Sequence, residues 1–431
     1  MNELQHLKPL SAVKTNGGIK FLTPAAFPGN HCPMHTALAL SSNIRGMSTL
    51  VVGTSECGTF SRNVITRSPN RHNALHWMYV LDANEVVFGC RQGVIEAIYQ
   101  MEKSGAKAIM LIFTCVPEVI GEDVEGIIRE MQPQIKARLS FVQMPHFKCN
   151  SYPSGYWKTL AAFAEIMEPR ETRPNVVNIL GRSPEEDHIP LPALLNALIK
   201  RGFHLRMLAP KSDIEDFIDS TDASLSLVLS PYMNPLAELM QQRFQVPFIS
   251  MHETYSGTEI GRLYESVAQT LGIDWDGEFE EQRTNILLLE SHTANVFRGA
   301  SYIATHRNLL SPLPLALYLT ELQMEPLLLH MEEFYPDDRK WAKALLNKGK
   351  NPLLCHMVNE PADAPVIERL GSDFSFGEIP AGTGVIPCAT YLYELYGQVG
   401  YERTELLLQK MLDAAKHINN SSTGRAGHGT I

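Results

Sequence analysis

The sequence predicts an α/β protein in which parallel sheets recur along the chain. Two kinds of segment alternate in it: short apolar runs rich in β-branched residues, and amphipathic helices that end at glycine. This order is typical of strand–helix–strand units, which pair their strands in parallel. The length of 431 residues suffices for about three domains of roughly 100–200 residues each. We therefore expect several parallel sheets, each covered by helices.

The first domain is predicted over residues 1–170. Residues 1–30 are expected to form an extended arm leading to Cys32, and Pro33 suits the first turn of a helix. Two apolar runs break at glycine or proline, which predicts buried strands that end in turns. The elements expected in this domain are a helix at 34–42, a strand at 48–52, a helix at 94–103, a strand at 108–113 and a helix at 124–131.

Two further domains are predicted, over 171–280 and 281–373, after a proline-containing linker at 168–174. Residues 374–431 are expected to form C-terminal helices that return onto the first domain. The strands expected in these parts lie at 175–180, 204–208, 225–229, 285–289 and 326–330. The helices expected there lie at 191–201, 313–323, 389–395 and 402–417.

The composition excludes several kinds of partner and site. A formal charge of −10 and a pI near 5.9 argue against an anionic partner, so we expect neither nucleic acid nor a membrane surface. No stretch reaches the roughly 18 apolar residues of a membrane span, and the first residues lack the pattern of a secretory signal. Seven cysteines at irregular spacing form no disulfide framework, so we expect a reduced, cytoplasmic protein.

Three cysteines are candidate ligands of a metal centre. Cys57 and Cys115 each follow a predicted buried strand, and ligands of open α/β sheets collect outside the carboxyl ends of strands. Thiolates suit iron–sulfur clusters, and Cys32 lies at a predicted helix N-terminus, where thiolate is favoured. The alternative is that these thiols only pack in the core, as free cysteines commonly do. No C-x-x-C occurs, which disfavours a zinc ribbon or a thioredoxin-type pair.

Three segments carry a resemblance to a known family: Gly53-Thr-Ser-Glu-Cys57-Gly58-Thr-Phe-Ser-Arg62, Glu85-Val-Val-Phe88-Gly89 and Phe113-Thr-Cys115-Val-Pro-Glu-Val-Ile-Gly-Glu-Asp123. Together with cysteine spacings of 25 and 58 residues, they are similar to component 1 of nitrogenase and nitrogenase-like reductases, and most similar to its beta-type subunit. The resemblance implies three Rossmann-like domains with parallel sheets. It also implies that Cys32, Cys57 and Cys115 bind an iron–sulfur cluster shared with a partner subunit, either an [8Fe-7S] P-cluster-like form or a [4Fe-4S] form.

The resemblance also implies two partners. An alpha-type homologous subunit would supply the remaining cluster ligands in an α2β2 heterotetramer, and a homodimeric, ATP-dependent iron protein would donate electrons. Phe88 resembles the exposed phenylalanine on which this iron protein docks; the alternative is a core phenylalanine at a strand end. Cys90 replaces a second glycine of the family pattern, and Cys149 lies near, but not at, the position of a serine that joins the cluster on oxidation. Neither is predicted to be a ligand.

Missing motifs narrow the chemistry. The absence of G-x-x-x-x-G-K-[ST] assigns ATP binding to a separate reductase, and the absence of G-x-G-x-x-G after a strand disfavours a nicotinamide cofactor. Where alpha-type subunits carry a cysteine that holds the active-site cofactor, this chain has Ser230-Pro231-Tyr232, and serine is a poor ligand for such a cofactor. We infer that the partner holds the substrate site, and we assign no catalytic residue to this chain.

Three functions remain open. The favoured one is the beta-type subunit of a nitrogenase-like reductase, and within that class a methylthio-alkane reductase, which reduces carbon–sulfur bonds. Gly53-Thr-Ser-Glu-Cys57 departs from the Gly-Ser-Gln-Gly-Cys motif of nitrogenase beta chains, but a nitrogenase or tetrapyrrole reductase subunit remains an alternative. The second function is a cofactor-assembly scaffold of the same family. The third is a cluster-free α/β protein that binds a small molecule between its domains.

Overall fold

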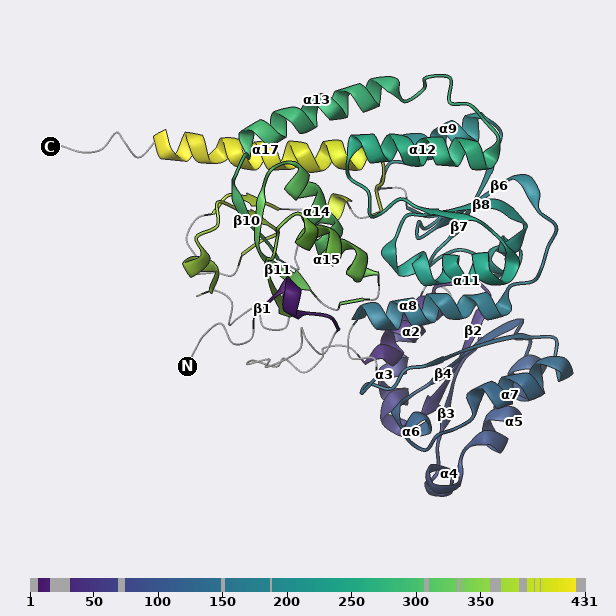
Figure 1. Ribbon diagram of the computed structural model, residues 1–431. Coiled ribbons are helices and arrows are strands. Elements are labelled where there is room, and N and C mark those ends of the chain that lie inside the picture. The colour runs from purple at the N-terminus through teal and green to yellow at the C-terminus, as the bar shows by residue number, and fades with distance from the viewer. Residues whose placement is uncertain are drawn as a thin grey trace. The chain divides into compact units, whose positions relative to one another are not determined.

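The computed structural model describes residues 7–15, 32–68, 74–148, 152–186, 188–305, 310–331, 334–335, 337–356, 366–379, 386–390, 392–395 and 397–423. The chain forms two compact units. Unit 1 comprises residues 1–28, 189–196 and 251–431, and unit 2 comprises residues 29–188 and 197–250. Figure 1 labels the helices and strands of both units. Most of the predicted arm at 1–30 lies outside the described residues.

The first sheet of unit 2 is fully parallel, with the strand order β3-β2-β4-β5. Its strands are β2 (Met47–Gly53), β3 (His76–Val80), β4 (Ala108–Phe113) and β5 (Arg138–Gln143). Every residue of β2 and β4 is buried, because helices cover both faces of the sheet. Strands that are buried on both faces are continuous apolar runs, which is why the sequence predicts these two strands.

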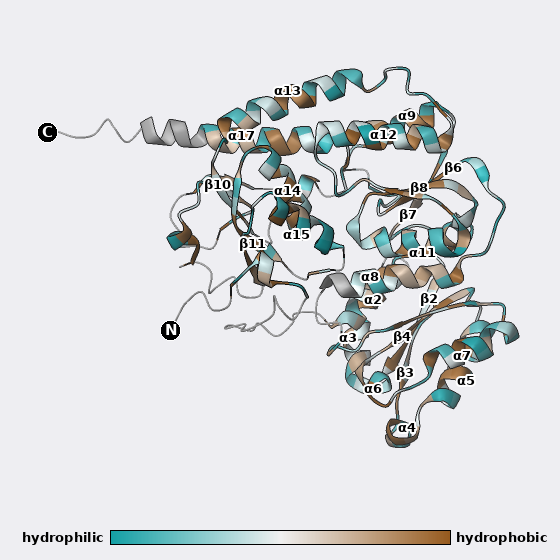
Figure 2. Cartoon of the chain, in the orientation of Figure 1, coloured by the Kyte–Doolittle hydropathy of each residue, from teal (hydrophilic) through white to brown (hydrophobic). Residues whose placement is uncertain are grey.

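Side chains of the two central strands alternate between two hydrophobic clusters. Val51 and Ile112 pack in one cluster with α2 (Pro33–Ser42), α3 (Ser55–Ile65) and α8 (Tyr152–Ala162). Leu50 and Leu111 pack in the other, with α5 (Arg91–Lys103) and α7 (Val124–Met131). The colouring of Figure 2 shows the sheet as the most hydrophobic layer between these helices. The helices predicted at 34–42, 94–103 and 124–131 are thereby confirmed.

The second sheet of unit 2 is also parallel, with the order β7-β6-β8-β9. Its strands are β6 (Arg173–Leu180), β7 (His204–Leu208), β8 (Ala223–Val228) and β9 (Phe248–Ser250). Helices α9 (Ala193–Lys200), α10 (Ile214–Ile218) and α11 (Asn234–Phe244) connect them. The strands predicted at 175–180, 204–208 and 225–229 are confirmed.

Unit 1 contains a six-stranded sheet in the order β1-β12-β11-β10-β13-β14, parallel except for β1. Its strands are β1 (Lys8–Pro9), β10 (Ser301–Ala304), β11 (Glu325–Met331), β12 (Leu353–His356), β13 (Phe374–Phe376) and β14 (Cys388–Ala389). Its main helices are α12 (Gly257–Leu271), α13 (Glu280–Val296), α14 (Pro312–Glu321), α15 (Asp338–Asn347) and α17 (Tyr401–Thr423). No described helix is both long enough and apolar enough to cross a bilayer.

Two predicted elements of unit 1 are wrong. The strand predicted at 285–289 lies inside helix α13, which packs against α17 and buries Ile286 while Leu288 is 66% exposed. A short apolar run has the same appearance in a buried strand and in a helix, so periodicity does not separate them. The helix predicted at 389–395 is instead the end of β14 followed by a 3-10 turn.

The two sheets of unit 2 lie within the ranges 1–170 and 171–280, whereas the sheet of unit 1 extends beyond the range 281–373 in both directions, since it includes β1 as well as β13 and β14. Strand β13 follows residue 373 and pairs with β10, so the sheet of unit 1 continues into the range 374–431. The C-terminal helix α17 packs against α13 and α12 of the same unit. The division into four ranges stays a prediction about how the chain separates into domains.

A buried ion pair holds the second sheet together and gives a stability prediction. Arg206 on β7 donates to both carboxylate oxygens of Asp222, and both side chains are buried. Replacing Asp222 with asparagine leaves the guanidinium of Arg206 without its counter-charge, and such a loss costs about 3 kcal/mol of unfolding free energy. The exposed pair of Arg243 and Glu165 provides the control, since Glu165→Gln should cost less than about 0.5 kcal/mol. Urea unfolding of both variants tests this, and equal midpoints would contradict it.

Candidate functional site

Cys57 and Cys115 lie side by side at one edge of the first sheet. Strands β2 and β4 are paired with Val52 opposite Phe113, so their carboxyl ends are level. Cys57 lies in the first turn of α3, which begins directly after β2, and Cys115 is the first residue of α6 (Cys115–Val119), which begins directly after β4. The two cysteines that the sequence places after strands are therefore brought to one site, in first helical turns instead of the expected loops.

The backbones of the two strand ends approach each other closely. Both the amide and the hydroxyl of Thr114 donate to the carbonyl oxygen of Val52, at 3.1 and 2.9 Å. A Cβ atom on Gly53 would lie 2.2 Å from Thr114 Oγ1 and 3.1 Å from Cys57 Sγ. Only glycine fits at position 53, because any side chain would displace the threonine or the thiol.

Cys32 reaches the same site from a different part of the chain. It is the N-cap residue of α2, with Pro33 in the first helical position as predicted. Burial raises the pKa of the Cys32 thiol, and the nearby thiols of Cys57 and Cys115 raise it further, while the amide of Met34 opposes them. Helix α2, which follows Cys32, also packs against α3, which carries Cys57.

All three cysteines lie at helix N-termini, where unpaired backbone N–H groups favour negative charge. A further N–H group reaches one of them directly: the amide of His146 donates to Cys115 Sγ over 3.2 Å. The hydroxyl of Thr54 lies 3.8 Å from Cys57 Sγ. Such surroundings stabilise a thiolate and can offset the negative charge of a bound group.

Cys90, the other cysteine of unit 2 that the structure describes, does not join this group. Cys90 is buried within the hydrophobic cluster of α5 and α7, and burial together with the carboxylate of Glu122 raises the pKa of its thiol. Cys355 and Cys388 belong to the sheet of unit 1. Cys149 lies outside the described residues.

Phe88 lies on the surface at the end of α4 (Ala83–Phe88). Its side chain is 85% exposed, and that of Val87 is 69% exposed. The alternative of a core phenylalanine at a strand end is wrong. The short helix is fixed by a capping box between Asp82 and Glu85, and Glu85 also accepts a hydrogen bond from Tyr79. In Figure 2, α4 is a hydrophobic protrusion beyond the sheet.

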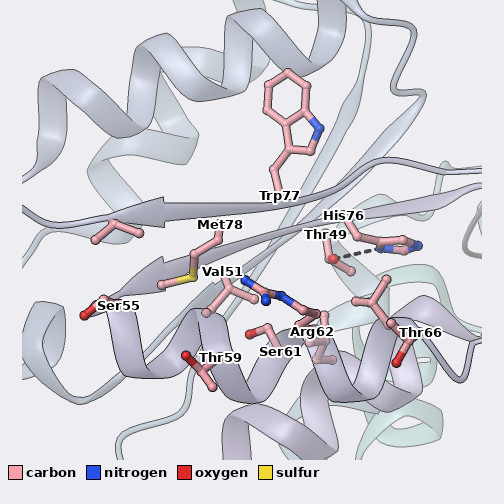
Figure 3. A pocket seen from close by; sticks show the side chains of 14 residues that line it. Thr49, Val51, Ser55, Thr59, Ser61, Arg62, Thr66, His76, Trp77 and Met78 are labelled. Atoms are coloured by element: carbon pink, nitrogen blue, oxygen red, sulfur yellow. Dashed lines mark hydrogen bonds between the residues drawn. The ribbon is translucent and has the colours of Figure 1, made fainter.

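A cavity of about 440 Å³ lies between α3 and β3, and the three cysteines do not line it (Figure 3). Arg62 and Thr59 enter it from α3, and Met78 and His76 enter it from β3. Burial lowers the pKa of His76 to about 4, so this ring is neutral at pH 7, and Thr49 Oγ1 lies 2.9 Å from its Nδ1. The ring of Trp77 points to the opposite side of the strand.

The sequence analysis assigned no role to two acidic residues around the site, although both lie in the segment from Phe113 to Asp123. Glu118, next to the Cys115 turn, forms an ion pair with Lys148 on the segment after β5. Glu122 accepts a hydrogen bond from the amide of Cys90 at 2.7 Å. Both contacts join residues about 30 positions apart in sequence, so no local pattern could have revealed them.

The comparison with known proteins agrees with this geometry. Residues 32–416 match the family described as nitrogenase component 1 type oxidoreductase. The chain belongs to this family. It is 22% identical over 422 residues to the nitrogenase molybdenum-iron protein beta chain of Methanococcus maripaludis, covering 87% of this chain and 89% of that protein. The beta chain of Methanothermobacter thermautotrophicus is also 22% identical, over 413 residues.

Other relatives of this nitrogenase component 1-type chain have a different described role. The nitrogenase iron-molybdenum cofactor biosynthesis protein NifE of Clostridium pasteurianum is 25% identical over 176 residues, 40% of this chain and 38% of that protein. Among solved structures, "Nitrogenase Cp1 at pH 6.5" matches with a TM-score of 0.67 and 15% identity, covering 95% of this chain and 99% of that chain. This match confirms the predicted α/β fold with parallel, Rossmann-like sheets.

The donor set of this component 1-type chain fits part of a cluster, not a complete metal site. Within the described ranges, no three His, Cys, Asp or Glu side chains converge to hold a single metal ion. An iron–sulfur cluster is bound differently, because each thiolate coordinates a different iron atom and the thiolates lie farther apart. Three neighbouring thiols at helix N-termini are compatible with that arrangement.

The close approach at Gly53 gives a prediction with an internal control. Gly53→Ala should lower the unfolding free energy by about 2 kcal/mol, because the added methyl group overpacks the contact with Thr114. Gly58, five residues later, has room: its Cβ would meet Met78 at an ordinary 3.5 Å. Gly58→Ala should therefore be neutral or stabilising by up to about 1 kcal/mol, since alanine favours helix. Denaturant unfolding of both variants tests this prediction. A Gly53→Ala variant as stable as the wild type would contradict the close contact with Thr114.

Proposed function

We propose that this chain is the beta-type subunit of a nitrogenase-like reductase. In this role it passes electrons from a separate ATP-dependent iron protein, through an iron–sulfur cluster at a subunit interface, to an active site on its partner. The observation that carries the proposal is the grouping of Cys32, Cys57 and Cys115 at the carboxyl edge of the first sheet. The similarity to beta chains over nearly the whole length supports it.

Cys32, Cys57 and Cys115 would hold the cluster, in an [8Fe-7S] P-cluster-like or a [4Fe-4S] form. When bound, the cluster would supply a site that accepts and releases electrons. The protein contributes the position of each sulfur and its surroundings. Gly53 lets the two strand ends approach, the amide of His146 donates to Cys115 Sγ, and the helix N-termini favour negative charge.

An alpha-type homologous subunit is the proposed partner. The three thiols of this chain need further ligands, and a related chain that presents its own cysteines at the same sheet edge would supply them. We propose an α2β2 heterotetramer in the cytoplasm, as expected from the resemblance. The exposed, apolar end of α4 supports docking of a homodimeric iron protein there, because an exposed phenylalanine is explained by an interface.

The substrate site is proposed to lie on the partner. Ser230 follows β8 at the place where alpha-type chains carry a cofactor-binding cysteine, and it is buried against Gly181. Its hydroxyl is a poor ligand for iron bound to sulfide. The departure of Gly53-Thr-Ser-Glu-Cys57 from the nitrogenase motif favours a nitrogenase-like enzyme, and the otherwise close likeness to the beta-type pattern favours a methylthio-alkane reductase among these. A nitrogenase or a tetrapyrrole reductase subunit is the alternative within the class.

One observation favours a second function. The matches to NifE, a protein named for cofactor biosynthesis, suit a scaffold on which a cofactor is assembled. A scaffold would bind a cluster in the same manner but would not turn over substrate with an iron protein. The full-length similarity to beta chains, against a partial one to NifE, favours the reductase.

Cys57→Ala tests the cluster. The complex should be purified without oxygen after co-expression with its partner, and its iron and sulfide counted alongside an EPR spectrum. We expect the variant to lose the interface cluster signal and most of the corresponding iron, because one of the three proposed thiolate ligands is removed. Cys90→Ala is the matched control. Its thiol is buried among the hydrophobic side chains of α5 and α7, so the iron content of this variant should equal that of the wild type. Equal iron in wild type and Cys57→Ala would reject the cluster.

Phe88→Ala tests the docking surface. The side chain is 85% exposed, so its removal should change the unfolding free energy by less than about 0.5 kcal/mol. Electron delivery from the iron protein should fall roughly tenfold, as for an aromatic residue central to an interface. The rate at which a small-molecule reductant reduces the complex should be unchanged. Leu288→Ala removes another exposed apolar side chain, on α13, and should leave both rates intact. An unchanged delivery rate in Phe88→Ala would place the docking surface elsewhere.

A further inference from the structure

The carboxylate of Glu122 joins two segments that the proposed function treats separately. Its Oε2 accepts a hydrogen bond from the amide of Cys90 at 2.7 Å. Cys90 begins α5 directly after the docking helix α4, and Glu122 follows the Cys115 helix α6. One hydrogen bond thus spans 32 residues of sequence, between the two parts of the chain that would meet the iron protein and the cluster.

On the docking side, Glu122 fixes the end of α4. The amide of Gly89 donates to the carbonyl of Glu85, which closes the helix, and Gly89 then adopts φ of 93°. A Cβ on Gly89 would lie 3.1 Å from Glu122 Oε2, so the carboxylate is packed against the turn that follows Phe88. With the capping box at its other end, α4 is held at both ends, which orients its exposed apolar side chains.

On the cluster side, Glu122 is tied to α6 by backbone hydrogen bonds. Its amide donates to the carbonyl of Pro117 at 3.0 Å, and the amide of Gly121 donates to the carbonyl of Glu118 at 3.2 Å. Pro117 lies within the single turn that starts at Cys115. A displacement of Glu122 would therefore move the helix turn that carries the cluster cysteine.

The surroundings of the carboxylate make the link strong. Cys90 is buried, and Glu122 raises the pKa of its thiol in addition to the effect of burial, so the thiol stays neutral beside the carboxylate. A hydrogen bond to a charged acceptor is about twice as strong as one between neutral groups. An ion pair between Arg91 on α5 and Glu130 on α7 is exposed on both sides.

We propose that the Glu122 carboxylate is a positioning group that fixes the docking helix α4 to the Cys115 segment, so that the docking surface and the cluster ligand keep one relative placement. This inference rests on the proposed function and adds a residue to it. The Glu122 carboxylate accepts from the amide of Cys90 on one side, and the Glu122 amide donates to the carbonyl of Pro117 on the other.

The first test measures hydrogen exchange by mass spectrometry in the full chain. Glu122→Ala should raise the exchange of amides in 84–90 and in 116–121 together, by roughly tenfold, because the amide of Cys90 loses its charged acceptor and the hydrogen bond that joins the two segments is lost. Glu122→Gln retains an acceptor oxygen and should stay within about threefold of wild type. Glu130→Ala breaks the neighbouring ion pair and should affect neither segment. The proposal is overturned if only one segment responds, or if Glu130→Ala has the same effect.

The second test separates positioning from mere stability. In the iron-loaded complex, Glu122→Ala should keep its iron and its rate of reduction by a small molecule, while electron delivery from the iron protein falls roughly tenfold and Glu122→Gln restores most of it. If Glu122→Ala binds iron and electron delivery from the iron protein is unchanged, the positioning role of Glu122 is rejected and the proposed function is not. A wild-type complex that binds no iron overturns the proposed function, and this role with it.

Discussion

The contact between Gly53 and Thr114 is the constraint on which the candidate site depends. Two neighbouring parallel strands end level with each other, and the threonine after one strand donates twice to the carbonyl of Val52 on the other. This leaves no room for a side chain at position 53. Because each of the two strands is followed directly by a helix, two cysteines reach the same sheet edge in first helical turns. The geometry of the sulfurs follows from how the strands end.

The same arrangement makes the site electrostatically suited to a negatively charged group and leaves it chemically incomplete. Helix N-termini and the amide of His146 favour thiolate, whereas burial of Cys32 disfavours its charge. Thiols with such opposing influences are well placed to bind soft metal, which replaces the proton and removes the cost of burying a bare thiolate. Three thiols are one fewer than the four thiolates that hold a common iron–sulfur cluster, which is the reason for the proposed dependence on a partner subunit.

Helix α4 is both exposed to solvent and held in place at its ends. Helix α4 presents Val87 and Phe88 to solvent, yet its ends are fixed by the capping box and by the turn against Glu122. An apolar surface that is held in place gains binding energy without the entropic cost of ordering a loop. The hydrogen bond from Cys90 to Glu122 joins this surface to the Cys115 helix, so one small region carries both proposed tasks of the chain.

The sequence by itself determined the parallel α/β architecture and the placement of Cys57 and Cys115 after strands. Central strands buried on both faces are continuous apolar runs, and this signal is local, as in β2 and β4. Edge strands β3 and β5 lack it and were not predicted. The apolar run at 285–289 was misread because a helix against α17 buries only one of its faces.

Only the tertiary structure decided which side chains meet. It brought Cys32 to the other two thiols, exposed Phe88, and placed Glu122 against Cys90. Each of these depends on strand register and on helix orientation, which are set by contacts between residues far apart in sequence. No local pattern encodes such contacts, and for that reason the sequence predicted the ligands while the structure alone revealed what positions them.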